Sequence, residues 1–183
     1  PNFKRYIESI TIDNPGSSYS SSNPPVLFIG APDSTDADAA LVQATATIEI
    51  LSNIVQSLTI VNPGDGYKTV PEVYLIGELH SVTNTSSVDS RRTANTYLNV
   101  PLSSSLATGR DGGSGATFNI VVDATGAVTS IVVNEGGSGF AEGEQLIIDS
   151  VSIGGSGNED PITMTVATIA GGGSGATFTP KVN

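Results

Sequence analysis

The side chains that could do chemistry in this sequence are few, and they form no catalytic pattern. The chain has no cysteine and a single histidine, His80, so neither a thiolate nucleophile nor a pair of imidazoles can be built. A serine nucleophile near His80 would need a G-x-S-x-G turn between a strand and a helix, which the sequence lacks. Two acidic side chains at a suitable separation could act as a glycosidase pair, but no motif singles out such a pair. We therefore expect a protein that is not an enzyme.

Glycine-rich runs and acidic loops offer two further kinds of site. The runs at 112–115 and 171–175 have the composition of phosphate-binding loops, but no Lys-Ser/Thr and no helix follow them. Their glycines are better explained as turn residues. Clustered oxygen atoms at 33–38 and 154–160 could hold Ca²⁺, although neither loop has the EF-hand spacing. We expect no cofactor, with Ca²⁺ at these two loops as the alternative.

The charge and the apolar runs narrow the possible partners. Seven Lys and Arg stand against 18 Asp and Glu, a net charge of -11 that repels nucleic acid and anionic membrane surfaces. The pair Arg91-Arg92 is too small for a nucleic-acid site, and we expect it in a solvated loop. Residues 1–6 lack the apolar region of a secretory signal, and no run approaches the roughly 18 apolar residues of a membrane span. We expect synthesis in a host cytoplasm.

The elements that position these side chains come from an internal repeat, which occurs three times without gaps. Each copy alternates apolar and polar residues, as a strand does, then has a Pro/Gly/Ser turn and an aromatic residue. We expect the aromatic residue to fold back over the end of the sheet as core packing. The copies are 9–19 (SITIDNPGSSY), 57–67 (SLTIVNPGDGY) and 130–140 (SIVVNEGGSGF).

A further predicted strand precedes two of the copies. Residues 43–50 precede the second copy and 115–122 precede the third, each through a short predicted hairpin. The same motif opens once more at 171–178, which repeats the pattern of 112–118. A strand there must pair either within its own chain or with a sheet of a neighbouring chain.

These patterns predict an all-β fold with almost no helix. We expect two related antiparallel β-sandwich-like units built from internal repeats. The predicted boundaries are 1–80 for the first unit, 81–111 for a polar connector with one possible strand at 95–102, and 112–183 for the second unit with an extra C-terminal strand.

The motifs Gly113–Phe118, Gly136–Phe140 and Asn62–Tyr67 resemble repeats in virion structural proteins of tailed bacteriophages, those of marine and cyanobacterial phages above all. Stretches of this kind cover well over half of the chain. The resemblance implies an exterior accessory component of a virion, such as a capsid decoration or cement protein or a tail or baseplate piece. Its partners would be other virion proteins and copies of itself. The chain is short and has no coiled-coil stem, so a fibre shaft is a poor fit.

Assembly would use β-edges and the terminal segments, and we therefore take Phe3, Tyr6, Phe178 and Val182 as candidate interface residues. The alternative function is a carbohydrate- or receptor-binding β module on a virion or cell surface. In that case Tyr74 and Tyr97 would contact a host-surface glycan. The absence of Trp and the 5% content of aromatic residues count against that alternative.

Overall fold

A computed structural model describes residues 5–36 and 40–183 of the chain. Its regular structure consists of β-strands and one short 3-10 helix, and the sheets are antiparallel. The predicted all-β class with almost no helix is confirmed. No helix in the described residues is long and apolar enough to cross a membrane.

The chain divides into two compact units. Unit 1 comprises Pro1–Ile76 and Gly173–Asn183, and unit 2 comprises Gly77–Gly172, so unit 2 is inserted between two parts of unit 1. The predicted boundaries 1–80, 81–111 and 112–183 differ from this division for two reasons. Residues 174–182 pair with the start of the chain, and the predicted connector 81–111 contributes strands to the sheets of unit 2.

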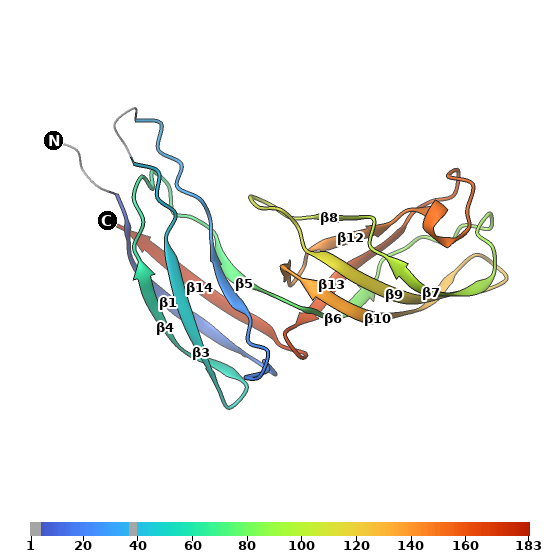
Figure 1. The fold of residues 1–183 in the computed structure, drawn as a ribbon, viewed down its shortest axis with the longest axis horizontal. Coiled ribbons are helices and arrows are strands. Elements are labelled where there is room, and N and C mark those ends of the chain that lie inside the picture. Colours follow the sequence, from blue (N-terminus) through green and yellow to red (C-terminus); the bar gives the residue numbers. More distant parts are fainter. Residues whose placement is uncertain (1–4, 37–39) are drawn as a thin grey trace. The chain divides into compact units, whose positions relative to one another are not determined.

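Unit 1 is made of three antiparallel strand pairs (Figure 1). Strand β1 pairs with β14, β3 pairs with β4, and β2 pairs with β5. The strands are β1 (Ile7–Ser17), β2 (Val26–Ile29), β3 (Thr45–Leu51), β4 (Ile54–Asn62), β5 (Val73–Gly77) and β14 (Ser174–Val182).

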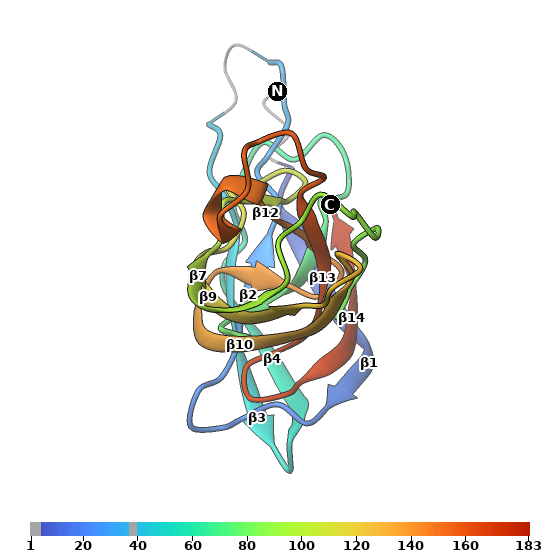
Figure 2. The ribbon, with the colours of Figure 1, turned by 90° about the vertical axis from the view of Figure 1, so that its right-hand side faces the viewer.

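Unit 2 contains a three-stranded sheet in the order β10-β9-β7 and a four-stranded sheet in the order β6-β13-β12-β8. Figure 2 shows β7, β9 and β10 side by side. The elements are β6 (Leu79–Asn84), β7 (Asn95–Pro101), β8 (Ser104–Leu106), β9 (Ser114–Val122), β10 (Val128–Ser138), β11 (Phe140–Ala141), β12 (Gln145–Ile148), the 3-10 helix η1 (Ser150–Ile153) and β13 (Ile162–Ile169).

The predicted strand at 95–102 corresponds to β7, while β6 and β8 are strands that the prediction assigned to a polar connector. The two units also have different sheets, so the predicted likeness of one unit to the other is not confirmed.

Alternation along the strands decides which side chains form each core. In β9 every second residue is buried, from Ala116 through Phe118 and Ile120 to Val122, because side chains of a strand point to alternate faces. In β3 the corresponding residues, such as Ile48, are only half-buried. The core of unit 2 is therefore more completely enclosed than the core of unit 1.

Candidate assembly surface

The three sequence repeats fold into three strand pairs with one common register. In the first, Ile12 of β1 lies opposite Phe178 of β14. In the third, Val133 of β10 lies opposite Phe118 of β9. The pair β3·β4 matches them, and the register of each pair shifts at the same point of the repeat, next to the turn. The strand β14 is therefore the partner that the first repeat needs.

One glycine of each repeat is required by the approach of the opposite strand. Gly16, Gly64 and Gly137 have φ values of 64°, 72° and 57°, in the left-handed region that favours glycine. A Cβ atom on Gly16 would lie 2.6 Å from the carbonyl oxygen of Ser174, and one on Gly137 would lie 2.1 Å from that of Ser114. Both effects exclude a side chain at this position of the repeat.

The aromatic residue of each repeat is buried, as predicted. Tyr19, Tyr67 and Phe140 are 2%, 0% and 0% exposed. The amide of Ala44 donates to the Tyr67 hydroxyl over 2.7 Å, and that hydroxyl donates to the Gly30 carbonyl over 3.1 Å. Burial raises the pKa of Tyr67 above its ordinary value.

The glycine-rich runs make room for these rings. A Cβ atom on Gly173 would lie 2.0 Å from Cδ1 of Tyr19, and one on Gly113 would lie 2.2 Å from Cδ1 of Phe140. The amide of Ala176 donates to the Tyr19 hydroxyl over 3.2 Å. The runs are thus part of the packing of the aromatic residues.

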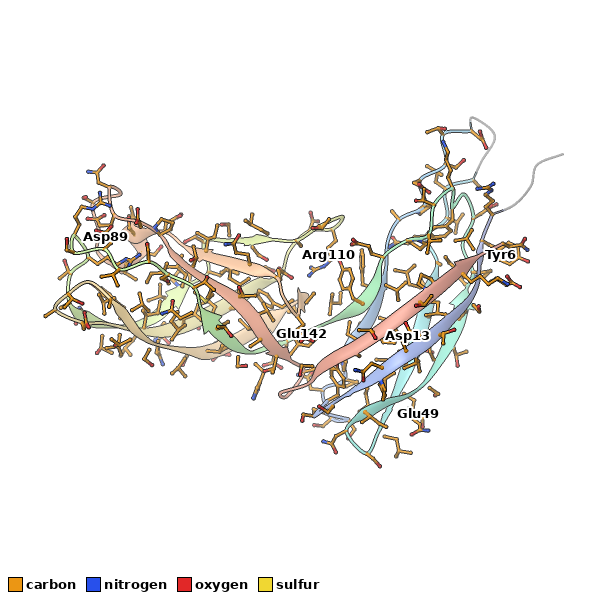
Figure 3. All side chains as sticks on the ribbon, turned by 180° about the vertical axis from the view of Figure 1, so that it is seen from behind. Tyr6, Asp13, Glu49, Asp89, Arg110 and Glu142 are labelled. Carbon is orange, nitrogen blue, oxygen red and sulfur yellow. The ribbon has the colours of Figure 1, made fainter. Side chains whose placement is uncertain are left out.

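The pair β1·β14 differs from the other two in how its strands are connected. A turn at Ser52 and Asn53 joins β3 to β4, whereas β1 and β14 come from the two ends of unit 1. Where a turn would otherwise stand, Asn183 donates its amide to the Tyr6 carbonyl over 3.0 Å and its Nδ2 to the Tyr6 hydroxyl over 2.7 Å. Figure 3 shows Tyr6 at this end of the pair, with Asp13 farther along β1.

The outward side chains of β1·β14 are polar and exposed. Lys181 Nζ lies 2.7 Å from Glu8 Oε2, with the two side chains 67% and 46% exposed. Thr179 donates its hydroxyl to Asp13 over 2.6 Å. An exposed ion pair adds little to stability. The two strands β1 and β14 are therefore held together mainly by their backbone hydrogen bonds and their buried side chains.

Three of the four candidate interface residues lie in or beside this pair. Phe3 is outside the described residues. Tyr6 is half-buried, Phe178 is 9% exposed, and half-buried Val182 lies opposite Ile7. The contacts described here are within the chain, so contact of these residues with another molecule stays a prediction.

The candidate glycan contacts lie in different units. Tyr74 of β5 is half-buried beside Phe28 of β2, with ring centroids 5.1 Å apart and planes inclined by 31°. Tyr97 of β7 is half-buried and donates its hydroxyl to the Thr93 carbonyl over 2.8 Å. Each ring is thus engaged by its own unit, and a role in glycan binding stays a prediction for both.

One carboxylate in each of the two acidic loops is engaged in hydrogen bonds within the chain. Asp33 accepts bonds from the Thr69 hydroxyl and from the amides of Thr69 and Lys68, and these bonds lower its pKa to about 2. Glu159 accepts bonds from the amides of Ser156 and Gly157, and its pKa is also about 2.

No group of three or more His, Cys, Asp or Glu residues suited to a metal ion occurs in the described part of the chain. Asp38, in the first acidic loop, lies outside that part. Ca²⁺ binding therefore stays a prediction.

A buried ion pair in unit 2 was not anticipated from the sequence. Glu144 accepts hydrogen bonds from Ser105, from Arg110 and from the amides of Gly113 and Ala141. The side chains of Arg110 and Glu144 are 7% and 2% exposed. Burial alone would raise the pKa of Glu144, but the four donors outweigh it and lower the pKa.

The expected solvated loop at Arg91-Arg92 is wrong for one of the two residues. Arg91 is exposed and forms two hydrogen bonds with Asp89, which hold the pKa of Asp89 below its ordinary range. Arg92 is 5% exposed, and its Nε has no partner among the described residues. Its terminal nitrogens donate to the carbonyls of Ser87, Gly126, Asp160 and Pro161. This arginine ties three loops of unit 2 together.

His80 lies exposed on β6. The comparisons with known proteins found no match for the chain among family models, curated protein sequences or solved structures.

Proposed function

We propose that this chain is a non-enzymatic structural protein on the exterior of a phage virion, a capsid decoration protein or a tail or baseplate piece. Its work would be to present β-edges and sheet faces to other virion proteins and to copies of itself. The observation that carries the proposal is the common register of β1·β14, β3·β4 and β9·β10. The motifs that resemble virion repeats have their glycines and aromatic residues engaged in closing sheets.

The charge distribution supports an exterior position. The net charge of -11 disfavours contact with packaged DNA. Asp33, Asp89 and Glu159, whose pKa values are lowered, are all engaged in hydrogen bonds to loop residues of the chain. Hydrogen-bonded loops and the buried pair Arg110–Glu144 suit a protein that works as a rigid surface.

Immunogold electron microscopy of intact virions from the encoding phage tests the proposal. Antibodies raised against unit 2 should label the outside of the particle at fixed positions. Virions without label, whether intact or disrupted, and without peptides of this chain in mass spectrometry would contradict it.

A carbohydrate-binding function has one observation in its favour. Leu27 and Leu75 are buried, so the alternating Phe28 and Tyr74 lie on the other face of β2·β5 as an aromatic pair. Such rings can pack on the apolar face of a sugar. Binding on a glycan array that is lost in Tyr74→Ala, at an unchanged unfolding midpoint, would favour this function over the structural one.

A further inference from the structure

We propose that β14 is exchanged between two copies of the chain, so that Ser174–Val182 of one copy pairs with β1 of the other. The proposal rests on the proposed structural function for its biological meaning. It names a second copy of this chain as the molecule that supplies β14 to β1. Two copies that each give and receive β14 close into a two-fold dimer in which each β1 has a β14 partner.

The connection between the strands permits exchange only at this pair among the three repeats. β3 and β4 follow each other through Ser52 and Asn53, and β9 and β10 through Asp123–Ala127. The two strands of β1·β14 are instead separated by the rest of unit 1 and all of unit 2. Exchange of β14 therefore opens no hairpin.

The segment that leads into β14 is a short and strained hinge. Ala170, Gly171 and Gly172 have φ values of 49°, 83° and 109°, so three consecutive residues are left-handed. Ala170 is 1% exposed and, unlike glycine, is strained at a positive φ. Gly172 donates its amide to the Ile169 carbonyl over 3.1 Å, which closes a tight turn. Exchange lets this turn extend, and strained short hinges are known to favour it.

The contacts that hold β14 would re-form between copies. Three kinds of contact join β14 to the first part of unit 1. They are the backbone hydrogen bonds with β1, the packing of Phe178 opposite Ile12, and the hydrogen bond from the Ala176 amide to the Tyr19 hydroxyl. The pair Lys181–Glu8 would also re-form, as an attraction between two chains that each carry a charge of -11. The exchanged dimer keeps the interactions between β1 and β14, and the hinge exchanges its strain for the loss of the turn bond from Gly172 to Ile169.

Disulfide trapping in the cysteine-free chain tests the exchange. Thr11 and Thr179 are Cα partners across β1·β14 and both are exposed. Thr11→Cys and Thr179→Cys chains of different tag length are mixed at high concentration, incubated and mildly oxidised. We expect a covalent heterodimer, visible on a non-reducing gel and by mass spectrometry.

A matched control uses Thr47→Cys and Thr59→Cys, which are exposed Cα partners in β3·β4. Their mixture should give only background cross-linking because a hairpin joins the two strands. A β1·β14 heterodimer no more abundant than this background would overturn the proposal. So would light scattering of the unmodified chain that shows monomer at every concentration reached.

A hinge variant separates exchange from other association. Ala170→Gly relieves the strain of the monomer and should lower the dimer-to-monomer ratio at equilibrium by about fivefold or more. An unchanged ratio would overturn the role of the hinge. A monomer found on virions would overturn the exchange and leave the proposed function standing, whereas virions without the protein would remove that function whatever β14 does.

Discussion

The pairs β9·β10 and β1·β14 place the same sequence repeat in two different settings. Both have the same register, and both require a glycine beside the opposite strand. A five-residue turn at Asp123–Ala127 joins the first pair, while the second is formed across the length of unit 2. Phe118 is 0% exposed in the first pair, and its counterpart Phe178 is 9% exposed in the second.

The comparison separates what the repeat specifies from what the chain connection adds. The local side chains specify the register and the seat of the aromatic residue wherever the two strands meet. The connection sets the entropic cost of bringing the two strands together from the unfolded chain. That cost grows by about 0.6 kcal/mol for each doubling of the length of the intervening loop. The entropic cost of forming this kind of strand pair is therefore larger in unit 1 than in unit 2. Among the described residues, unit 1 also buries fewer apolar side chains.

Removal of β14 should have the largest effect of the changes considered. A chain without residues 174–183 loses Phe178 and leaves β1 without its partner, so unit 1 should lose cooperative unfolding at a cost above about 3–5 kcal/mol. NMR amide spectra should lose the dispersed signals of unit 1 and keep those of unit 2. A chain that lacks only Asn183 is the control, and a dispersed unit 1 spectrum after the deletion would break the comparison.

The next largest effect should come from the ion pairs, whose contributions to stability should differ between the two units. Glu144→Gln leaves Arg110 buried without a carboxylate and should destabilise unit 2 by about 3–5 kcal/mol in urea unfolding. Lys181→Gln, at the exposed pair of unit 1, should cost less than about 1 kcal/mol. Equal effects of the two substitutions would contradict the contrast between a buried and an exposed pair.

The same carboxylate predicts an acid response of unit 2. The pKa of Glu144 is lower in the folded protein than its ordinary value of 4.5, so its contribution is complete above that value. The contribution is lost as the pH falls through the folded pKa. Glu144→Gln should therefore show a smaller loss of unit 2 stability between neutral pH and pH values below 4.5. A parallel pH profile of the two proteins would count against this role.

The repeat glycines should matter equally in both pairs. Gly16→Ala and Gly137→Ala each place a Cβ atom within 2.6 Å of a backbone oxygen at a positive φ, and each should cost about 2–3 kcal/mol. Gly109→Ala is the control, because Gly109 has a φ of 71° and no atom within 4 Å of the added Cβ. It should cost only the backbone strain of about 1 kcal/mol. If Gly16→Ala left the free energy of unfolding unchanged while Gly137→Ala lowered it, the strands of β1·β14 would be less tightly packed than those of β9·β10.

The aromatic hydroxyls should give the smallest effects. Tyr67→Phe leaves the buried Ala44 amide without its acceptor and should cost about 1–2 kcal/mol. Tyr19→Phe should cost less, since its bond from Ala176 is longer, at 3.2 Å against 2.7 Å. Thermal unfolding of both variants, with the more exposed hydroxyl of Tyr97 removed as control, measures the difference. A larger loss for Tyr19→Phe would contradict the predicted order of the two hydroxyls.

Much of the fold could be predicted from the repeats. Alternation in 115–122 and 130–140 identified β9 and β10, and the alignment located the three buried aromatic residues. The partner of β14 could also have been found. The strands at 43–50 and 115–122 already serve the second and third repeats, so only the repeat at 9–19 lacked one.

Two strands of unit 2 and its buried charged residues could not be predicted, because the sequence shows no pattern for them. β6 (LHSVTN) and β8 (SSL) are polar enough to look like loop, and their pairing is decided by the strands β13 and β12 beside them. The burial of Arg92 and Glu144 depends on carbonyls and amides from distant loops, which no spacing in the sequence reveals. Contact with other molecules at Tyr6, Phe178 and Val182 depends on surfaces outside this chain.

The insertion of unit 2 between the parts of unit 1 sets an order of events on the ribosome. β14 is synthesised only after every strand of unit 2, so unit 1 cannot complete its last strand pair before then. Nascent unit 1 must wait with β1 lacking its partner, while unit 2 can pair its strands among themselves. We therefore expect the long-range pairing of β1 with β14 to be a late and slow step of folding, as contacts distant in sequence usually are.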